Sequence, residues 1–278
     1  MRIDLHTHSN RSDGTDTPTQ LVEKAVEAGL DVVAITDHDS TAGWDEAQAA
    51  ADRLGITLVR GIEFSTMLDG VSVHLLGYGF DPTDVPLLTE LRRILDGRDN
   101  RLPALLDKLG DHGMPLTVAD VVAQSGSAAA SGRPHVADAM VAAGYVADRD
   151  EAFQDWLYDN GPAFVERYGA PLPDAIRLLR EAGGVSVIAH PWARKARRVL
   201  PPDVLADLAD QGLAGVEVDH NNHSPEVRAE LRAVAADLGL VVTGSSDYHG
   251  TGKGPDFHLG VNTTAPEQFE TLFAQVPG

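Results

Sequence analysis

The sequence contains no cysteine, which excludes disulfide bonds, thiolate metal sites and a cysteine nucleophile. It also has no apolar run near the ~20 residues that a membrane-spanning helix needs. The first residues, from Arg2 onward, show strand character and no apolar stretch typical of a secretory signal. We therefore expect a soluble cytoplasmic protein without a membrane partner.

Basic residues are scarce: 22 Lys and Arg stand against 42 Asp and Glu, which gives a formal net charge of −20. Proteins that bind long nucleic acid neutralise its phosphates with clustered Lys and Arg, so we expect no binding to duplex nucleic acid. A small anionic substrate is compatible with this charge if cationic side chains line its pocket. With 278 residues, 43% of them hydrophobic, the chain has enough material for two domains or one large α/β barrel.

Strand and helix patterns alternate at both ends of the chain. Toward the N-terminus the predicted strands are 2–5, 31–36, 56–64 and 71–76, and the predicted helices are 17–29 and 44–54. Toward the C-terminus the predicted strands are 185–189, 215–219 and 240–243, and the predicted helices are 174–182, 203–210 and 226–238. Between them, residues 81–170 show only helical patterns, at 87–95, 102–109, 118–124 and 136–143. This order predicts an α/β fold with a mostly parallel sheet and a helical insertion.

Histidines and acidic residues gather where the predicted strands end. The residues in these positions are His6, His8, His38, Glu63, His74, His190, His220, Asp247 and His249. The carboxyl ends of parallel strands converge on one face of the fold, so we expect these side chains to lie together. Imidazole and carboxylate groups bind Zn²⁺, Mn²⁺ and Fe²⁺, and a cluster this rich would hold two or three ions. His112 and His258 do not fit this pattern.

Four motifs resemble those of the PHP (polymerase and histidinol phosphatase) superfamily. They are Asp4-Leu5-His6-Thr7-His8-Ser9, Thr36-Asp37-His38-Asp39-Ser40, Ile188-Ala189-His190-Pro191 and Ser246-Asp247-Tyr248-His249-Gly250. The segments 61–65 and 74–78 fit the same family. Within the insertion, Gly132-Arg133-Pro134-His135-Val136-Ala137 resembles the stand-alone bacterial PHP phosphoesterases that act on nucleotides. The motifs occur in the family's order and extend over nearly the whole chain.

The resemblance implies a distorted (β/α)₇ TIM-like barrel, formed by residues 1–80 and 171–278, with a helical insertion over 81–170 that contributes to the substrate pocket. It also implies a catalytic centre of two or three divalent ions, with Mn²⁺ expected first and Zn²⁺ or Fe²⁺ as alternatives. By motif, one metal site takes His6, His8, Glu63 and Asp247. A second takes Asp13, His38 and His249. A third takes His74 and His190, with Glu63 as a bridge.

Residues outside this metal set are expected to contact the substrate. Arg133 and His135 suit phosphate, because Arg binds it through two parallel hydrogen bonds and His donates a hydrogen bond or a proton. His220 and His223 follow a predicted strand, and we expect them to face the pocket. The basic cluster Arg194, Lys195, Arg197 and Arg198 follows the His190 strand, and we expect Arg197 to guide a second phosphate.

The resemblance implies hydrolysis of small nucleotide phosphates by a metal-activated hydroxide. The expected substrates are a nucleoside 3′,5′-bisphosphate, a nucleoside monophosphate or the 5′ end of short single-stranded RNA. The main alternative is histidinol-phosphate phosphatase, and a PHP module without catalytic activity is another.

Two alternatives come from other enzyme classes. Asp37-His38-Asp39-Ser40-Thr41 fits the nucleophile motif of haloacid-dehalogenase-type phosphatases, but that interpretation leaves the other histidines unexplained. An amidohydrolase with a carbamylated lysine would need a lysine at a strand end, and Lys24, Lys108, Lys195 and Lys253 all fall in predicted helices or loops.

Overall fold

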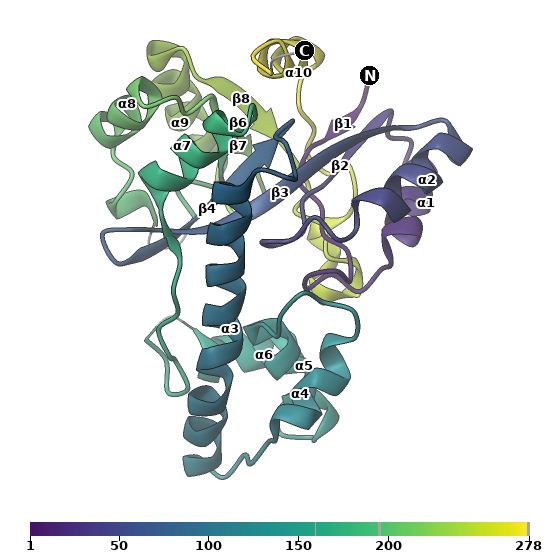
Figure 1. The fold of residues 1–278 in the computed structure, drawn as a ribbon, viewed down its shortest axis with the longest axis vertical. Coiled ribbons are helices and arrows are strands. Elements are labelled where there is room, and N and C mark those ends of the chain that lie inside the picture. Colours follow the sequence, from purple (N-terminus) through teal and green to yellow (C-terminus); the bar gives the residue numbers. More distant parts are fainter. Residues whose placement is uncertain (159, 194–195, 277–278) are drawn as a thin grey trace.

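The computed structural model describes residues 1–158, 160–193 and 196–276, and its sheet curls into a nearly closed barrel (Figure 1). The strands are β1 (Ile3–Asp4), β2 (Val32–Ile35), β3 (Thr57–Leu68), β4 (Val71–Tyr78), β6 (Val185–Ala189), β7 (Gly215–Asp219) and β8 (Val241–Gly244), hydrogen-bonded in that order. The short strand β5 (Ala170–Pro171) pairs with β3. Strand pairs are parallel except those of β4, which runs antiparallel to β3 and β6.

The ends of β1 and β8 meet through a bridge between Thr7 and Tyr248, where the His8 N–H donates to the Tyr248 carbonyl at 2.8 Å. The predicted distorted TIM-like barrel is thereby confirmed.

Helices surround the barrel at positions that local sequence signals predict. They are α1 (Pro18–Glu27), α2 (Trp44–Leu54), α7 (Leu172–Glu181), α8 (Pro202–Asp210), α9 (Pro225–Leu238) and α10 (Pro266–Phe273). At the start of α1, the Gln20 N–H donates to Thr17 Oγ1 and the Thr17 N–H donates back to Gln20 Oε1, and the two bonds together form a capping box. Helix α2 ends at Gly55, whose φ of 73° is left-handed and favours glycine. No described helix is long and apolar enough to cross a membrane.

The hairpin of β3 and β4 is longer than the sequence predicts. Pairing continues as far as Leu68 and Val71, and the turn between them uses Asp69 and Gly70, both with positive φ. Because β4 returns antiparallel, its first half lies at the end of the barrel where the parallel strands finish. His74, four residues from the turn, therefore lies near the ends of β1 and β2.

The insertion consists of α3 (Val85–Asp111), α4 (Val118–Ser125), α5 (Arg133–Ala142) and α6 (Arg149–Ala152), which continues as a π-helical turn over Phe153–Leu157. The prediction of separate helices at 87–95 and 102–109 is wrong, because α3 is one continuous helix of 27 residues. The polar stretch between them indicated a break. In the structure it stays helical, and Arg98 and Arg101 on it are buried toward the barrel mouth.

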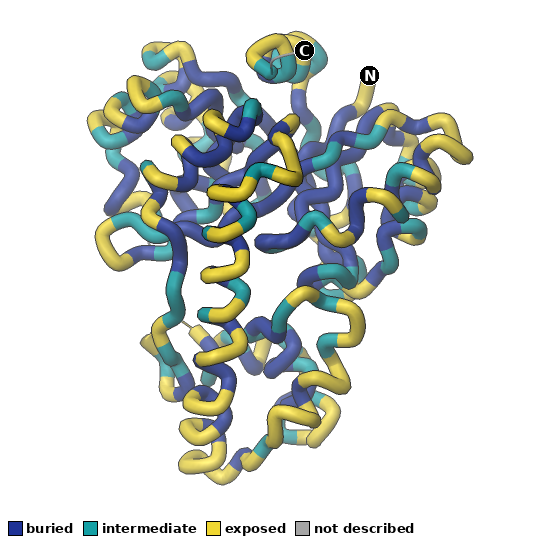
Figure 2. The backbone as a smooth tube through the Cα atoms, viewed as in Figure 1, coloured by how far each residue is buried: buried dark blue, intermediate teal, exposed yellow. Residues whose placement is uncertain are grey.

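Helix α3 runs from the barrel into the insertion and carries buried positions along its length (Figures 1 and 2). Its residues belong to two hydrophobic cores. Its first half, including Leu87 and Ile94, packs with the helices and the outer face of the barrel. Its second half, including Leu105 and Leu109, packs with α4 and α5. The division into barrel and insertion at residues 80 and 170 stays a prediction, since one helix connects both cores.

Because α3 spans both cores, we predict a single cooperative unfolding transition. Ile94→Ala and Leu105→Ala should each destabilise that transition by roughly 2–5 kcal/mol, the usual cost of truncating a buried aliphatic side chain. Val85→Ala is the matched control on the same helix, since Val85 is 71% exposed. Urea denaturation followed by circular dichroism measures the change. Two separate transitions, with each variant moving only one, would contradict the prediction.

Candidate metal centre

The predicted metal ligands gather at one end of the barrel. His6 and His8 lie just beyond β1 and, two residues apart in extended backbone, point to the same side. His38 follows β2, His190 follows β6, and Asp247 and His249 follow β8. Asp13 reaches the same place from the loop after His8. The structure thus brings together all nine residues that the motifs indicate.

The carboxylate of Glu63 lies at the centre of this group and is only 1% exposed. Its two oxygens lie within 3.5 Å of ring nitrogens of five histidines: His6, His8, His38, His74 and His190. The shortest contact joins Glu63 Oε1 and His74 Nδ1 at 2.7 Å. Glu63 therefore has the position of a bridging ligand.

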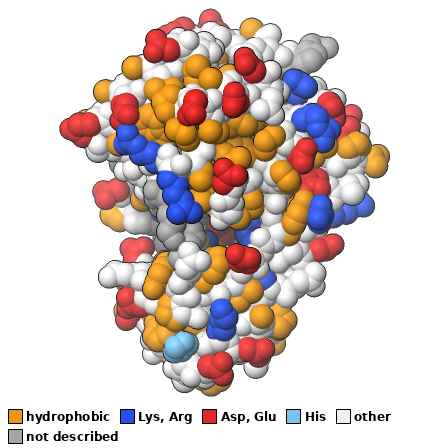
Figure 3. Space-filling model, turned by 90° about the vertical axis from the view of Figure 1, so that its left-hand side faces the viewer, with side chains coloured by type: hydrophobic (Ala, Val, Ile, Leu, Met, Phe, Trp, Pro, Cys, Tyr) orange, Lys and Arg blue, Asp and Glu red, His pale blue; other side chains and the backbone are white. Residues whose placement is uncertain are grey.

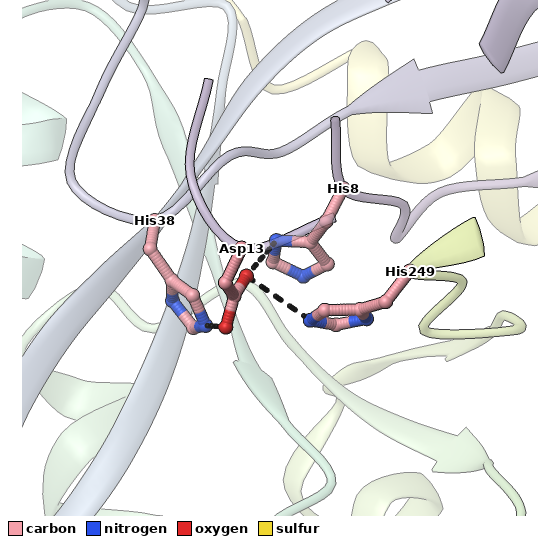
Figure 4. A group of neighbouring side chains, drawn as sticks. All are labelled: His8, Asp13, His38 and His249. Carbon is pink, nitrogen blue, oxygen red and sulfur yellow. Dashed lines mark ion pairs between the residues drawn. The ribbon is translucent and has the colours of Figure 1, made fainter. Parts of the chain in front are cut away.

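Three groups of side chains have donor atoms within 4.8 Å of one another, close enough to share an ion: His6 with His8 and Asp247; His8 with Asp13, His38 and His249; and His38 with Glu63 and His74. Figure 4 shows the second group, in which Asp13 Oδ1 lies 3.3 Å from His249 Nε2 and Asp13 Oδ2 lies 3.6 Å from His38 Nε2. The groups resemble the three predicted sites but share His8 and His38. His190 touches the third group through Glu63 rather than as a member of it.

The charge state of the centre suits divalent cations. Burial would raise the pKa of Glu63, but His38, His74 and His6 hold it well below the usual range. Burial lowers the pKa of His38 to about 3, so this imidazole is neutral and has a lone pair to offer. His38 Nδ1 lies 3.1 Å from Glu63 Oε2 but is not oriented for a hydrogen bond to it or to any other described residue. Burial lowers the pKa of His8, but hydrogen bonds to Asp247 and Glu63 outweigh it and raise this pKa to about 9. The pKa of His6 is raised as well, so a bound cation would displace protons from these two rings. Ionised carboxylates and deprotonated imidazoles are the donor set that Zn²⁺, Mn²⁺ and Fe²⁺ require, so the residues present fit the predicted metals.

Glu217, which the sequence analysis does not single out, lies fully buried behind the ligands. Its Oε1 is 3.1 Å from His6 Nδ1, and its Oε2 accepts the His190 N–H at 2.9 Å. A carboxylate on the far nitrogen of a ligating histidine orients the ring. The signal in the sequence was an acidic residue between two valines at the centre of a predicted strand.

Asp37 does not face the centre. Its carboxylate accepts hydrogen bonds from the Ser9 N–H at 2.8 Å and from the Ser9 and Ser12 hydroxyls at 2.6 Å. Its pKa is raised by burial. A carboxylate with these partners is not placed as a nucleophile, which argues against the haloacid-dehalogenase interpretation.

A cavity of about 240 Å³ opens over the metal centre, and its walls carry six cationic side chains: Arg98, Arg101, Arg133, Arg149, Arg167 and Lys253. The five arginines all come from the insertion, while Lys253 comes from the loop after His249 and contacts Asp247. Sequence reasoning found only Arg133 of these six. The other arginines are scattered over 70 residues and form no local basic run.

The remaining predicted substrate residues lie outside this cavity. His135 is buried beside a smaller cavity behind Asp13 and His38, and its Nδ1 accepts the Gly132 N–H at 3.0 Å. His220 is buried with its Nε2 3.2 Å from Asp247 Oδ2, and His223 Nδ1 lies 2.9 Å from the Val218 carbonyl oxygen. Each of these histidines already has a partner in the protein.

The predicted role of Arg197, a member of the basic cluster, does not match its position. Arg197 is exposed, pairs with Glu230 at 2.6 Å and stacks on Trp192, and it does not line the cavity. Its surface ion pair replaces the predicted phosphate contact. Arg194 and Lys195 lie outside the described residues.

The chain matches the family model of the PHP domain over residues 4–104. It is 34% identical to a 3′,5′-nucleoside bisphosphate phosphatase of Chromobacterium violaceum over 91% of this chain and 88% of the relative. It is also 34% identical to a 5′-3′ exoribonuclease of Haemophilus influenzae, over 89% of this chain and 90% of the relative. A phosphoribosyl 1,2-cyclic phosphate 1,2-diphosphodiesterase of Eggerthella lenta is 32% identical over 95% of this chain and its own full length.

A solved structure from Bifidobacterium adolescentis, described as that of a metal-dependent phosphoesterase, superposes with a TM-score of 0.93 at 36% identity. The match covers 99% of this chain and 96% of the other. The barrel, the histidine and carboxylate clusters and these relatives agree. The chain belongs to the PHP family and is a metal-dependent phosphoesterase, a hydrolase of phosphoric esters.

Proposed function

We propose that this phosphoesterase acts on small nucleotides that carry more than one phosphate, with a nucleoside 3′,5′-bisphosphate as the preferred substrate and the 5′ end of short single-stranded RNA as a further one. The observation that carries the proposal is the ring of five arginines and one lysine around the metal centre. One phosphate of such a substrate would lie over the metal ions, and a second would meet the cationic side chains of the cavity wall. The nucleotide phosphatase and exoribonuclease names of two relatives support the same substrate class.

The acidic exterior restricts the size of the substrate. Acidic side chains are spread over the face in Figure 3, and the net charge is −20. This exterior repels every phosphate that stays outside the cavity, so a polyanion is disfavoured as it lengthens. A duplex is also too wide for a cavity of about 240 Å³. A mononucleotide or a short single strand places its charge among the arginines.

The clustered histidines and carboxylates would hold two or three divalent ions, with Mn²⁺ proposed first. When bound, such ions lower the pKa of water and polarise the phosphoryl oxygens. The chain's own contribution is to position the ester and to stabilise its charge. Arg133, whose Nη1 donates to the Leu157 carbonyl at 2.8 Å, is held at the cavity wall by the end of the π-helical turn. Its guanidinium is proposed to pair with a phosphate of the substrate.

The same cationic ring disfavours histidinol phosphate. That substrate carries an ammonium group, which would lie among arginines and meet like charge. A second phosphate meets the opposite charge there. We therefore propose nucleotide hydrolysis over the histidinol phosphate alternative.

Removal of divalent metal should abolish turnover. The described lining of the cavity includes no serine, threonine, tyrosine or cysteine, and all its carboxylates and imidazoles except Asp150 are proposed metal ligands. His8→Ala should lower the bound metal more than His74→Ala, since His8 belongs to two of the three donor groups and His74 to one. Elemental analysis of dialysed protein, together with hydrolysis of adenosine 3′,5′-bisphosphate, measures both effects.

Asp37→Asn is the control for this experiment. It should keep its metal and measurable turnover, because Asp37 accepts hydrogen bonds from Ser9 and Ser12 and does not face the cavity. Full activity in metal-stripped protein, or complete loss in Asp37→Asn with metal retained, would overturn the metal mechanism.

Arg133→Ala should lower kcat/KM for the bisphosphate by about 10–100-fold, the usual effect of losing a charged hydrogen bond of about 1.5–3 kcal/mol. Metal content should stay at the wild-type value. Arg197→Ala is the matched control and should leave kcat/KM unchanged, since its guanidinium pairs with Glu230 at the surface. If kcat/KM is the same in both variants, Arg133 does not contact the substrate as proposed.

The substrate class itself is tested by comparing kcat/KM at fixed ionic strength. We expect adenosine 3′,5′-bisphosphate to exceed AMP, short single-stranded RNA to be cleaved from its 5′ end, and long duplex to be inert. A higher kcat/KM for histidinol phosphate would instead support the histidinol-phosphate phosphatase alternative. Preference for duplex would contradict the argument from cavity size and charge.

A further inference from the structure

Arg149 connects the insertion to two loops that carry metal ligands. It is the first residue of α6, and its Nε and Nη2 donate to the two carboxylate oxygens of Asp138 on α5, both at 2.6 Å. Its Nη1 donates to the backbone carbonyls of Asp13 at 3.2 Å and Gly252 at 3.3 Å. The first carbonyl belongs to a candidate ligand, and the second follows His249 by three residues.

These contacts indicate that Arg149 mainly holds parts of the protein together and contacts the substrate less. A guanidinium has five N–H groups, and the four described bonds engage four of them. The side chain is only 15% exposed. Although Arg149 lines the cavity, little of its hydrogen-bonding capacity is left for a phosphate.

The two loops are also hydrogen-bonded to each other. The Thr15 N–H donates to the His249 carbonyl at 3.1 Å, and the Thr251 N–H donates to Thr15 Oγ1 at 2.9 Å. A side chain at Gly252 would collide with Arg149 Nη1, so glycine permits this close approach. Without the guanidinium, two backbone carbonyls would lose their donor beside the group of ligands in Figure 4.

We propose that Arg149 is a positioning residue, which holds Asp13 and His249 in ligating geometry by anchoring both loops to Asp138. Filling of the His8, Asp13, His38 and His249 group is then coupled to docking of α5 and α6 on the barrel. The inference rests on the metal part of the proposed function and not on the identity of the substrate.

The test titrates metal-stripped protein with MnCl₂ by isothermal titration calorimetry. In Arg149→Met we expect one Mn²⁺ site to weaken by about 10–100-fold, the usual effect of losing a partner behind a metal ligand, while the remaining sites keep their affinity. Arg149→Lys and Asp138→Asn should weaken the same site less, and they keep the test usable if Arg149→Met does not fold. Arg177→Met, which removes an exposed arginine ion pair on α7, is the control.

Two further measurements separate positioning from substrate contact. The fall in kcat/KM of Arg149→Met should be smaller at saturating Mn²⁺ than at limiting Mn²⁺, because added ion refills the weakened site, and hydrogen exchange in the metal-free variant should rise at residues 12–16 and 249–253. Unchanged Mn²⁺ affinity, with or without a raised KM, would overturn the inference. A wild-type protein that binds no divalent ion would overturn the proposed function as well, so the two failures are distinguishable.

Discussion

The burial of several carboxylates at one end of the barrel is the constraint on which the rest of the site depends. Glu63, Glu217 and Asp247 are each at most 3% exposed, and a buried ion without a partner costs several kcal/mol. The neighbouring strand ends therefore supply imidazole, hydroxyl or cationic groups as partners for these carboxylates. Asp39, His190 and Asp247 have positive φ, an uncommon backbone conformation that recurs at functional sites. The opposite half of the barrel interior is apolar, with Leu5, Tyr78 and Val187 filling it.

The barrel and the clustering of the candidate metal ligands were predictable because both leave local patterns. Apolar runs bounded by helix caps indicate strands, and His-x-His after the first of them fixes the side to which both rings point. Arg98 and Arg101 left no such pattern, because a polar stretch within a helix looks the same whether it faces solvent or a pocket. The basic run that includes Arg197 is a clear pattern in the sequence, but such a run does not show which way each side chain points. Arg197 pairs with Glu230 at the surface.

Charge is distributed in opposite senses outside and inside the molecule. The chain carries 20 more acidic than basic residues, yet six of its 22 Lys and Arg residues line one cavity. Ion pairs such as Arg98 with Asp39, at 2.7 Å, hold these cations in place before any substrate arrives. Charges that are fixed in advance need no reorganisation when a phosphate binds. This placement of charge is the basis of the proposed preference for a compact anionic substrate.

The separate origins of the metal ligands and the cavity arginines have an evolutionary consequence. All nine predicted ligands come from the barrel segments, and all five cavity arginines come from residues between 98 and 167. Drift within that segment can redirect an ancestral enzyme to a new phosphate ester while its metal chemistry is inherited intact. Relatives of 32–34% identity with names for three different substrates are consistent with such a history. If Arg149 positions the metal ligands as proposed, an insertion exchanged between lineages must bring an equivalent of Arg149 and Asp138.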